Sequence, residues 1–139
     1  MQVMPEQTLI AFDYGTKKIG VAIGNTLTRV ARPLEIITSV TRDQRFADIA
    51  RVLHEWQPDK VVVGLPLTET GETQYATLRC RRFANQLHGR FGTLVELVDE
   101  RGSSVEAQEL LGSNAPDDAV AAAVILQRYL DALPPSLSV

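Results

Sequence analysis

TLIAFDYGTKKIGVAIG, at residues 8–24, joins two apolar segments through a short turn. The first segment ends in one carboxylate, Asp13, and the turn that follows contains Gly15, Lys17 and Lys18. An Asp at the end of an apolar strand is held at the edge of a core, beside a glycine that lets a ligand approach the backbone. Partial burial of a carboxylate is costly unless a positive group meets it, and a divalent cation with bound phosphate would do so. The alternative left open by these residues is a hairpin in which Asp13 hydrogen-bonds the amides of the turn.

The rest of the chain alternates between strand and helix patterns. DKVVVGLP at 59–66 is a strand buried on both faces, because its valines do not alternate with polar residues. Three early strands can pair as an antiparallel meander, whereas the later strands need helical crossovers and lie parallel, which predicts an α/β domain. We expect strands at 8–13, 18–24, 34–40, 59–66 and 93–99, and helices at 42–56, 72–88, from Ser103 to about Gly112, and 117–133.

Length and composition predict one soluble domain over residues 1–139, with frayed ends at about 1–6 and 134–139. No apolar run approaches the roughly 20 residues that cross a bilayer, and the N-terminus lacks the pattern of a signal peptide. We therefore expect a cytoplasmic protein without a membrane partner. The single cysteine, Cys80, excludes an internal disulfide, and its position on the inner stripe of the helix at 72–88 predicts core packing.

Charge is distributed unevenly along the chain, although the net charge is only −3. Residues 73–95 contain four arginines and no acid, whereas residues 96–139 contain eight acids and two arginines. A metal-dependent nuclease needs both: cations for the phosphate backbone and carboxylates for the metal. The arginines of the 72–88 helix could equally form an ordinary solvated face.

Carboxylates from three distant segments are expected to meet at one sheet edge. Asp13 ends the first strand, Asp99 and Glu100 end the fifth, and Asp117 and Asp118 open the last helix. Sites of α/β sheets lie outside the C-terminal ends of the parallel strands. Two like charges about 4 Å apart repel by roughly 4 kcal/mol at a surface-like dielectric, and Mg²⁺ or Mn²⁺ would remove that penalty. Acids in the first turn of a helix are also ordinary partners of the helix dipole.

The chain resembles the YqgF/RuvX family of RNase H-like nucleases. The matching stretches cover most of the domain in the family's order: FDYGTKKIGVAIG at 12–24, ARPL at 31–34, EWQPDKVVVGLPL at 55–67, RRFANQLHGRFG at 81–92, VDERGSSVEA at 98–107 and DAVAAAVILQRYL at 118–130. The resemblance implies an RNase H-like fold, with a five-stranded mixed sheet flanked by helices on both faces. It also implies a cytoplasmic phosphodiesterase that uses one or two Mg²⁺ or Mn²⁺ ions and matures the 5′ end of the 16S ribosomal RNA precursor.

By motif, the resemblance assigns the catalytic and metal-binding roles to Asp13, Glu100 and Asp118, with Asp99 and Asp117 as alternates. The expected phosphate contacts, close to these acids in sequence, are Lys17, Lys18 and Arg101. The short GSNAPD segment before the last helix departs from the family, which often has a longer basic loop there. This departure predicts weaker or altered binding of nucleic acid.

Three functions remain as hypotheses. The leading hypothesis is an endonuclease that cuts structured RNA such as pre-rRNA. The second is a Holliday junction resolvase that cuts branched DNA, which would need a symmetric homodimer to act on both strands. The third is a non-catalytic RNA-binding factor of ribosome assembly that keeps the fold. The aromatic residues are scattered along the sequence and predict no platform for reading RNA bases.

Overall fold

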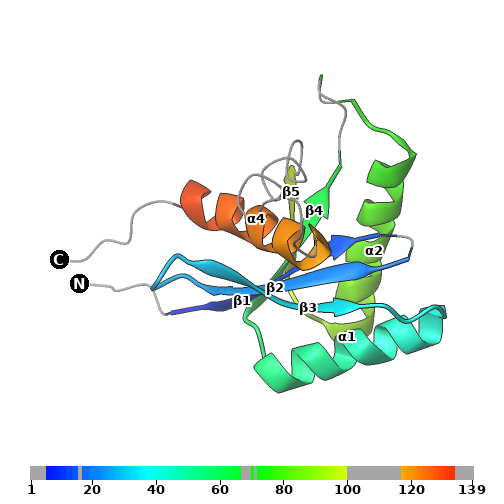
Figure 1. Ribbon diagram of the computed structural model, residues 1–139, viewed down its shortest axis with the longest axis horizontal. Helices are drawn as coiled ribbons and strands as arrows, with labels where there is room; N and C mark the ends of the chain where they lie inside the picture. The colour runs from blue at the N-terminus through cyan, green and yellow to red at the C-terminus, as the bar shows by residue number, and fades with distance from the viewer. Residues whose placement is uncertain (1–5, 16, 67–69, 71, 100–116, 134–139) are drawn as a thin grey trace.

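The computed structural model describes residues 6–15, 17–66, 70, 72–99 and 117–133 (Figure 1). The predicted frayed ends, apart from Glu6, and the helix predicted from Ser103 to about Gly112 lie outside this part of the chain. No helix in the described ranges is long and apolar enough to pass through a bilayer. The elements are β1 (Thr8–Tyr14), β2 (Ile19–Asn25), β3 (Ala31–Ile37), α1 (Arg42–Trp56), β4 (Lys60–Leu65), α2 (Tyr75–Phe91), β5 (Val95–Asp99) and α4 (Asp117–Ala132).

The strands form one mixed sheet in the order β3-β2-β1-β4-β5. The first three are antiparallel, with Asp13 of β1 opposite Gly20 of β2. β4 is parallel to both β1 and β5, so these three strands end at the same edge of the sheet. The predicted meander followed by parallel strands is confirmed.

Helices cover both faces of the sheet (Figure 1). Ile10 and Phe12 of β1 pack with α1 and α2 in the larger core, whereas Leu9 and Ala11, which point the other way, pack under α4. Because successive residues of a strand point to opposite faces, this alternation assigns every β1 side chain to one of two layers. Cys80 is buried in the larger core, which confirms its predicted packing role.

Two elements, β3 and α2, are shifted by three residues from the expectation, whereas the bounds of the other described elements agree within two residues. β3 spans residues 31–37 instead of 34–40. Proline is tolerated in an edge strand, and β3 is one, so Pro33 lies inside the strand while Val40 is 94% exposed. α2 begins and ends three residues later than predicted: Gln74 and Thr77 form a capping box, and Gly92 ends the helix with a φ of 65°.

The inner stripe of α2 also needs one correction. Ala76, which helical spacing assigns to the same inner stripe as Cys80, is exposed, and the buried residue is its neighbour Thr77. The Thr77 hydroxyl donates a hydrogen bond to the carbonyl oxygen of Pro66 and also accepts one from the Gln74 amide. A hydroxyl whose hydrogen bonds are satisfied can be buried at little cost. A search for apolar residues alone therefore does not predict that Thr77 is buried.

Candidate active site

Asp13 is held by the turn between β1 and β2. The amide of Gly15 donates a hydrogen bond to the carbonyl oxygen of Lys18 across a distance of 3.0 Å. A Cβ atom at residue 15 would lie 2.6 Å from that same oxygen, so the turn requires glycine. Lys17 and Lys18 are exposed in the turn, which fits a contact with a ligand.

The Asp13 side chain belongs to the α4 face of the sheet. It continues the row of Leu9 and Ala11, which pack under α4, and it is partly buried. Its partner across the ladder is Gly20, which has no side chain. β2 therefore places no side chain beside the carboxylate on this face.

Contacts with Gly24 fix the direction of α4 over the sheet. A Cβ atom at Gly24 would lie 3.0 Å from Leu126 Cδ2 and 3.2 Å from Leu130 Cδ1, and Gly24 pairs with Leu9 at the start of β1. The C-terminal half of α4 thus covers the beginning of β1, and its N-terminus points toward the end of β1 that bears Asp13 (Figure 1).

A polar cluster fastens the C-terminal half of α4 to the sheet. Lys60 Nζ, at the start of β4, donates hydrogen bonds of 2.9 Å to the Tyr129 hydroxyl and to a Glu96 carboxylate oxygen. The hydrogen bonds to Tyr129 and then to Glu96 raise the pKa of Lys60 above its ordinary value. Since this cluster lies at the start of β4, it holds the helix at the end of the sheet away from Asp13.

Asp99 ends β5 on the other face of the sheet. It pairs with Leu65, whose side chain packs in the core below α1 and α2. Paired residues of neighbouring strands point to the same face, so the pleat directs Asp99 away from the face of Asp13. The Asp99 carbonyl oxygen accepts a hydrogen bond of 3.1 Å from Arg128 Nη1 of α4.

Several predicted site residues fall outside the described structure. Glu100 and Arg101 lie outside it entirely, and only the backbones of Asp117 and Asp118 are described. Within residues 6–15, 17–66, 70, 72–99 and 117–133, no three His, Cys, Asp or Glu side chains lie close enough to hold a metal ion. Of the predicted ligands, Asp13 is the one whose described environment fits a hard cation: a partly buried carboxylate at a strand end, opposite a glycine.

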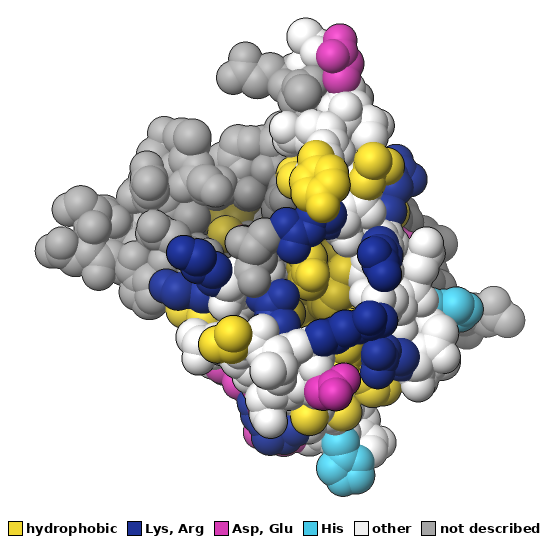
Figure 2. Space-filling view, turned by 90° about the vertical axis from the view of Figure 1, so that its right-hand side faces the viewer, with side chains coloured by type: hydrophobic (Ala, Val, Ile, Leu, Met, Phe, Trp, Pro, Cys, Tyr) yellow, Lys and Arg dark blue, Asp and Glu magenta, His cyan; other side chains and the backbone are white. Residues whose placement is uncertain are grey.

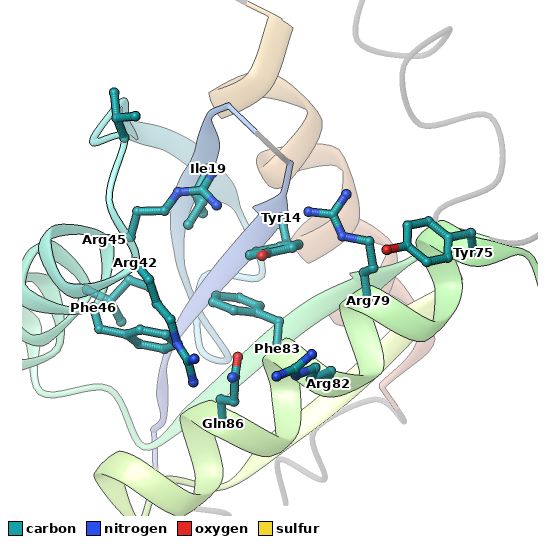
Figure 3. Close-up of a pocket in the computed structure, with 12 residues that line it drawn as sticks. Tyr14, Ile19, Arg42, Arg45, Phe46, Tyr75, Arg79, Arg82, Phe83 and Gln86 are labelled. Carbon is teal, nitrogen blue, oxygen red and sulfur yellow. The ribbon is translucent and has the colours of Figure 1, made fainter.

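A second feature lies at the same edge of the sheet and was not predicted from the sequence. A pocket of about 360 Å³ lies between α1 and α2 on the face opposite α4. We call it the arginine pocket, because its lining includes Arg42 and Arg45 of α1 and Arg79 and Arg82 of α2, around the ring of Tyr14 (Figure 3). The acid-free segment 73–95 was a signal for the α2 arginines, but nothing in the sequence shows that α1 supplies two more.

Comparison with known families identifies the fold and the enzyme class. The model of the family RuvX, described as "Holliday junction resolvase", matches residues 7–132. The chain belongs to the RuvX family. This membership confirms the resemblance and the predicted enzyme class, a hydrolytic endonuclease that acts on nucleic acid. Nucleases with this fold depend in general on divalent metal ions.

Relatives of high identity extend over almost the whole chain. A protein of Bordetella petrii named "Putative pre-16S rRNA nuclease" is 73% identical over 131 residues, covering 94% of this chain and 100% of its own length. A protein of Burkholderia mallei with the same name is 53% identical and is covered over 91% of its length, with 93% of this chain.

Solved structures confirm the RNase H-like fold. RuvC of Thermus thermophilus, in complex with a Holliday junction, superposes with a TM-score of 0.58 at 17% identity, covering 91% of this chain and 94% of that one. The fowlpox virus Holliday junction resolvase gives a TM-score of 0.58 at 16% identity, covering 91% of this chain and 99% of that one. At these identities the likeness is one of fold.

Proposed function

We propose that this RuvX-family protein is a metal-dependent endonuclease that processes the 5′ end of pre-16S rRNA, with Asp13, Glu100 and Asp118 as ligands of Mg²⁺ or Mn²⁺. The substrate rests on the name carried by relatives up to 73% identical. The single structural observation behind the site is the position of Asp13, partly buried at the C-terminal edge of β1 beside Gly20 and below α4.

The direction of α4 supports Asp118 as the second ligand. Leu126 lies over Gly24, level with Leu9, and residue 118 precedes it by eight positions, or about 12 Å of helix. From Leu9 to Asp13 the strand advances about 13 Å. The two backbones are therefore expected to be level where α4 begins, and helical spacing assigns residue 118 to the same stripe as Ala122, which is buried against the sheet.

The pleat of β5 supports Glu100 over its neighbour as the third ligand. Asp99 belongs to the face of α1 and α2, whereas a ligand that shares an ion with Asp13 must come from the α4 face. The residue that follows Asp99 in the sequence has the opposite orientation if the strand alternation continues. Asp117 stays an alternate for Asp118, since adjacent residues of a first helical turn lie close together.

Each element of this site has a defined part in phosphodiester cleavage. Bound divalent ions would polarise the phosphate and activate a water for in-line attack. The carboxylates would hold those ions, and Gly20 would place no side chain in the way of a phosphate beside Asp13. Lys17 and Lys18, exposed in the neighbouring turn, would attract the substrate backbone.

The test compares two Asp to Asn variants on two substrates. Purified wild type, Asp13→Asn and Asp131→Asn are incubated with a precursor rRNA fragment and, separately, with a four-way DNA junction, each with Mn²⁺ or with EDTA. Asp131 is the matched control, because it lies near the C-terminal end of α4, away from Asp13. We expect Asp13→Asn to lower RNA cleavage by about a hundredfold or more without unfolding, and Asp131→Asn to match wild type.

Other results would redirect or reject the assignment. Undiminished cleavage by Asp13→Asn would reject the metal site, and RNA binding without any metal-dependent cleavage would indicate an assembly factor. Symmetric cutting of the DNA junction by a stable dimer, with the rRNA fragment left intact, would favour a resolvase.

A further inference from the structure

The arginine pocket concentrates positive charge that the described part of the protein does not neutralise. Arg42, Arg45, Arg79 and Arg82 line it together with aromatic side chains, and no Asp or Glu is among the lining residues. None of the four forms an ion pair with an acidic side chain in the described ranges. Figure 2 shows the same pattern on the surface, with dark blue side chains around a hollow that has apolar side chains at its base.

Arg45 is the most constrained of these side chains. It is 9% exposed, and its Nη2 atom donates a hydrogen bond of 2.6 Å to the carbonyl oxygen of Gly15. Its Nε atom is buried and has no hydrogen-bond partner among the described residues. An unsatisfied buried donor on a charged group is costly, and an anion in the pocket would remove that cost.

Tyr14 brings guanidinium groups of both helices together. The Cζ atoms of Arg45 and Arg79 lie 5.3 Å and 5.7 Å from the centre of its ring, so the two charges are no farther apart than the sum of these distances. Two like charges about 10 Å apart repel by about 1–2 kcal/mol at an effective dielectric of 20. The ring is itself fixed by stacking on Phe83, with centroids 4.3 Å apart. The pocket is therefore a prearranged cationic site.

The position of the pocket relates it to the proposed metal site. Tyr14 follows Asp13 in β1, and because neighbours on a strand point to opposite faces, the pocket and the carboxylate lie on the two sides of one strand end. The turn with the exposed Lys17 and Lys18 lies between them. A chain of phosphates that passes over this turn would meet positive charge on the way to Asp13.

We propose that the arginine pocket binds the phosphodiester backbone of a single-stranded segment of the RNA substrate, next to the segment that is cut. This assignment rests on the proposed nuclease function, because the polyanion that would occupy the pocket is the RNA substrate of that function. A volume of about 360 Å³ suits a ligand of nucleotide size rather than a duplex. Tyr75, 76% exposed at the rim beside Arg79, offers a ring on which a base can stack.

Two adjacent arginines of α2 provide a matched test. Arg82 lines the pocket, whereas Arg81, the preceding residue of the helix, is exposed and does not. Binding of a fluorescent single-stranded oligouridine of about 12 nucleotides is measured in EDTA for wild type, Arg82→Gln, Arg81→Gln and the double variant Arg79→Gln/Arg82→Gln. The two single variants lose the same charge from neighbouring sites, so a difference between them reports the pocket.

The proposal predicts that the two single variants differ in their affinity for the oligouridine. Arg82→Gln should weaken oligouridine binding at least about fivefold. It should also reduce the slope of log K against log salt by about 0.7, the value for one phosphate that is no longer neutralised. The double variant should reduce this slope by about 1.4. Arg81→Gln should stay within about twofold of wild type. Equal losses for the two single variants, or no loss in either, would overturn the proposal. Micromolar affinity for inorganic phosphate at constant ionic strength would assign the pocket to a small anion and would also overturn it.

The same variants separate this inference from the proposed function. Asp13→Asn should bind the oligouridine in EDTA like wild type, because the carboxylate lies on the other face of the sheet. Arg82→Gln should raise KM for precursor RNA and leave kcat close to wild type. Failure of Asp13→Asn to lower cleavage would reject the metal site and leave the binding result standing.

Discussion

Gly24 is expected to set how closely α4 approaches the sheet, and Gly24→Ala should therefore destabilise the protein. An added Cβ would lie 3.0 Å from Leu126 Cδ2, 3.2 Å from Leu130 Cδ1 and 3.3 Å from the carbonyl oxygen of Val30. Comfortable carbon–carbon contacts lie at about 3.5–4.0 Å, so each neighbour must move by a few tenths of an ångström. Leu126 and Leu130 are fully buried, which leaves them little freedom to do so.

The expected size of the effect follows from two opposing contributions. Overpacking of a filled core costs about 1–3 kcal/mol, and replacement of glycine by alanine returns about 0.4–1 kcal/mol through the unfolded state. Central values of about 2 and about 0.7 kcal/mol leave a net loss of about 1.3 kcal/mol. In urea, with a slope of about 2 kcal/mol per molar, the midpoint should fall by about 0.6 M.

Gly89→Ala is the matched control, because a Cβ at that residue of α2 has nothing within 4 Å. Alanine is the better helix former, so this variant should gain up to about 1 kcal/mol. Urea unfolding of both variants is followed by circular dichroism. In a double-mutant cycle, Leu126→Val should relieve part of the Gly24→Ala loss. A Gly24→Ala protein as stable as wild type, or strict additivity with Leu126→Val, would refute close packing at this point.

Three further predictions concern other parts of the fold. Gly15→Ala should disrupt the turn after β1, because the added Cβ would lie 2.6 Å from the Lys18 carbonyl oxygen. We expect the free energy of unfolding in urea to fall by about 1–3 kcal/mol and RNA cleavage to decrease. Wild-type values for both would contradict the geometry. Lys60→Met should cost about 1 kcal/mol at pH 7, because it removes the hydrogen bond to Tyr129. Since the folded pKa of Lys60 is raised, its contribution should be complete below the unfolded pKa of 10.5 and disappear as the pH rises through the folded pKa; a difference between variant and wild type that shrinks already between pH 6 and 8 would argue against this. Thr41→Ala should cost about 1 kcal/mol, because its side chain caps the N-terminus of α1, and an unchanged urea midpoint would show the cap to be dispensable.

The sequence was most informative where one physical signal acts alone. Sequence patterns predicted α1 at its observed bounds, 42–56, and in the structure Thr41 caps its first turn. The unbroken valines at 61–63 predicted the doubly covered strand β4, because only a strand with helices on both sides buries them all. The resemblance to the family added that the five predicted strands form one sheet with helices on both faces, which local patterns could not supply.

Prediction was weaker where distant contacts decide the outcome. β3 was predicted three residues late, and Pro33, which disfavours a strand unless the strand is an edge, lies inside it. The arginine pocket was missed because its cations come from two helices that are adjacent only in the fold. For the candidate site, the motif indicated Asp13, and the register of β5 adds a physical argument against Asp99, which belongs to the opposite face of the sheet.

Asp13 and Tyr14 are neighbours in the chain, yet they serve opposite surfaces of the sheet. Removing one residue from the middle of β1 would exchange these assignments: the acid would enter the cationic hollow and the phenol would take its place under α4. With Asp13 as the proposed metal ligand and the arginine pocket as the proposed RNA site, catalytic chemistry and affinity for substrate would be tuned in evolution from separate layers of the molecule. An insertion or deletion within β1, however, would disturb both the environment of Asp13 and the arginine pocket.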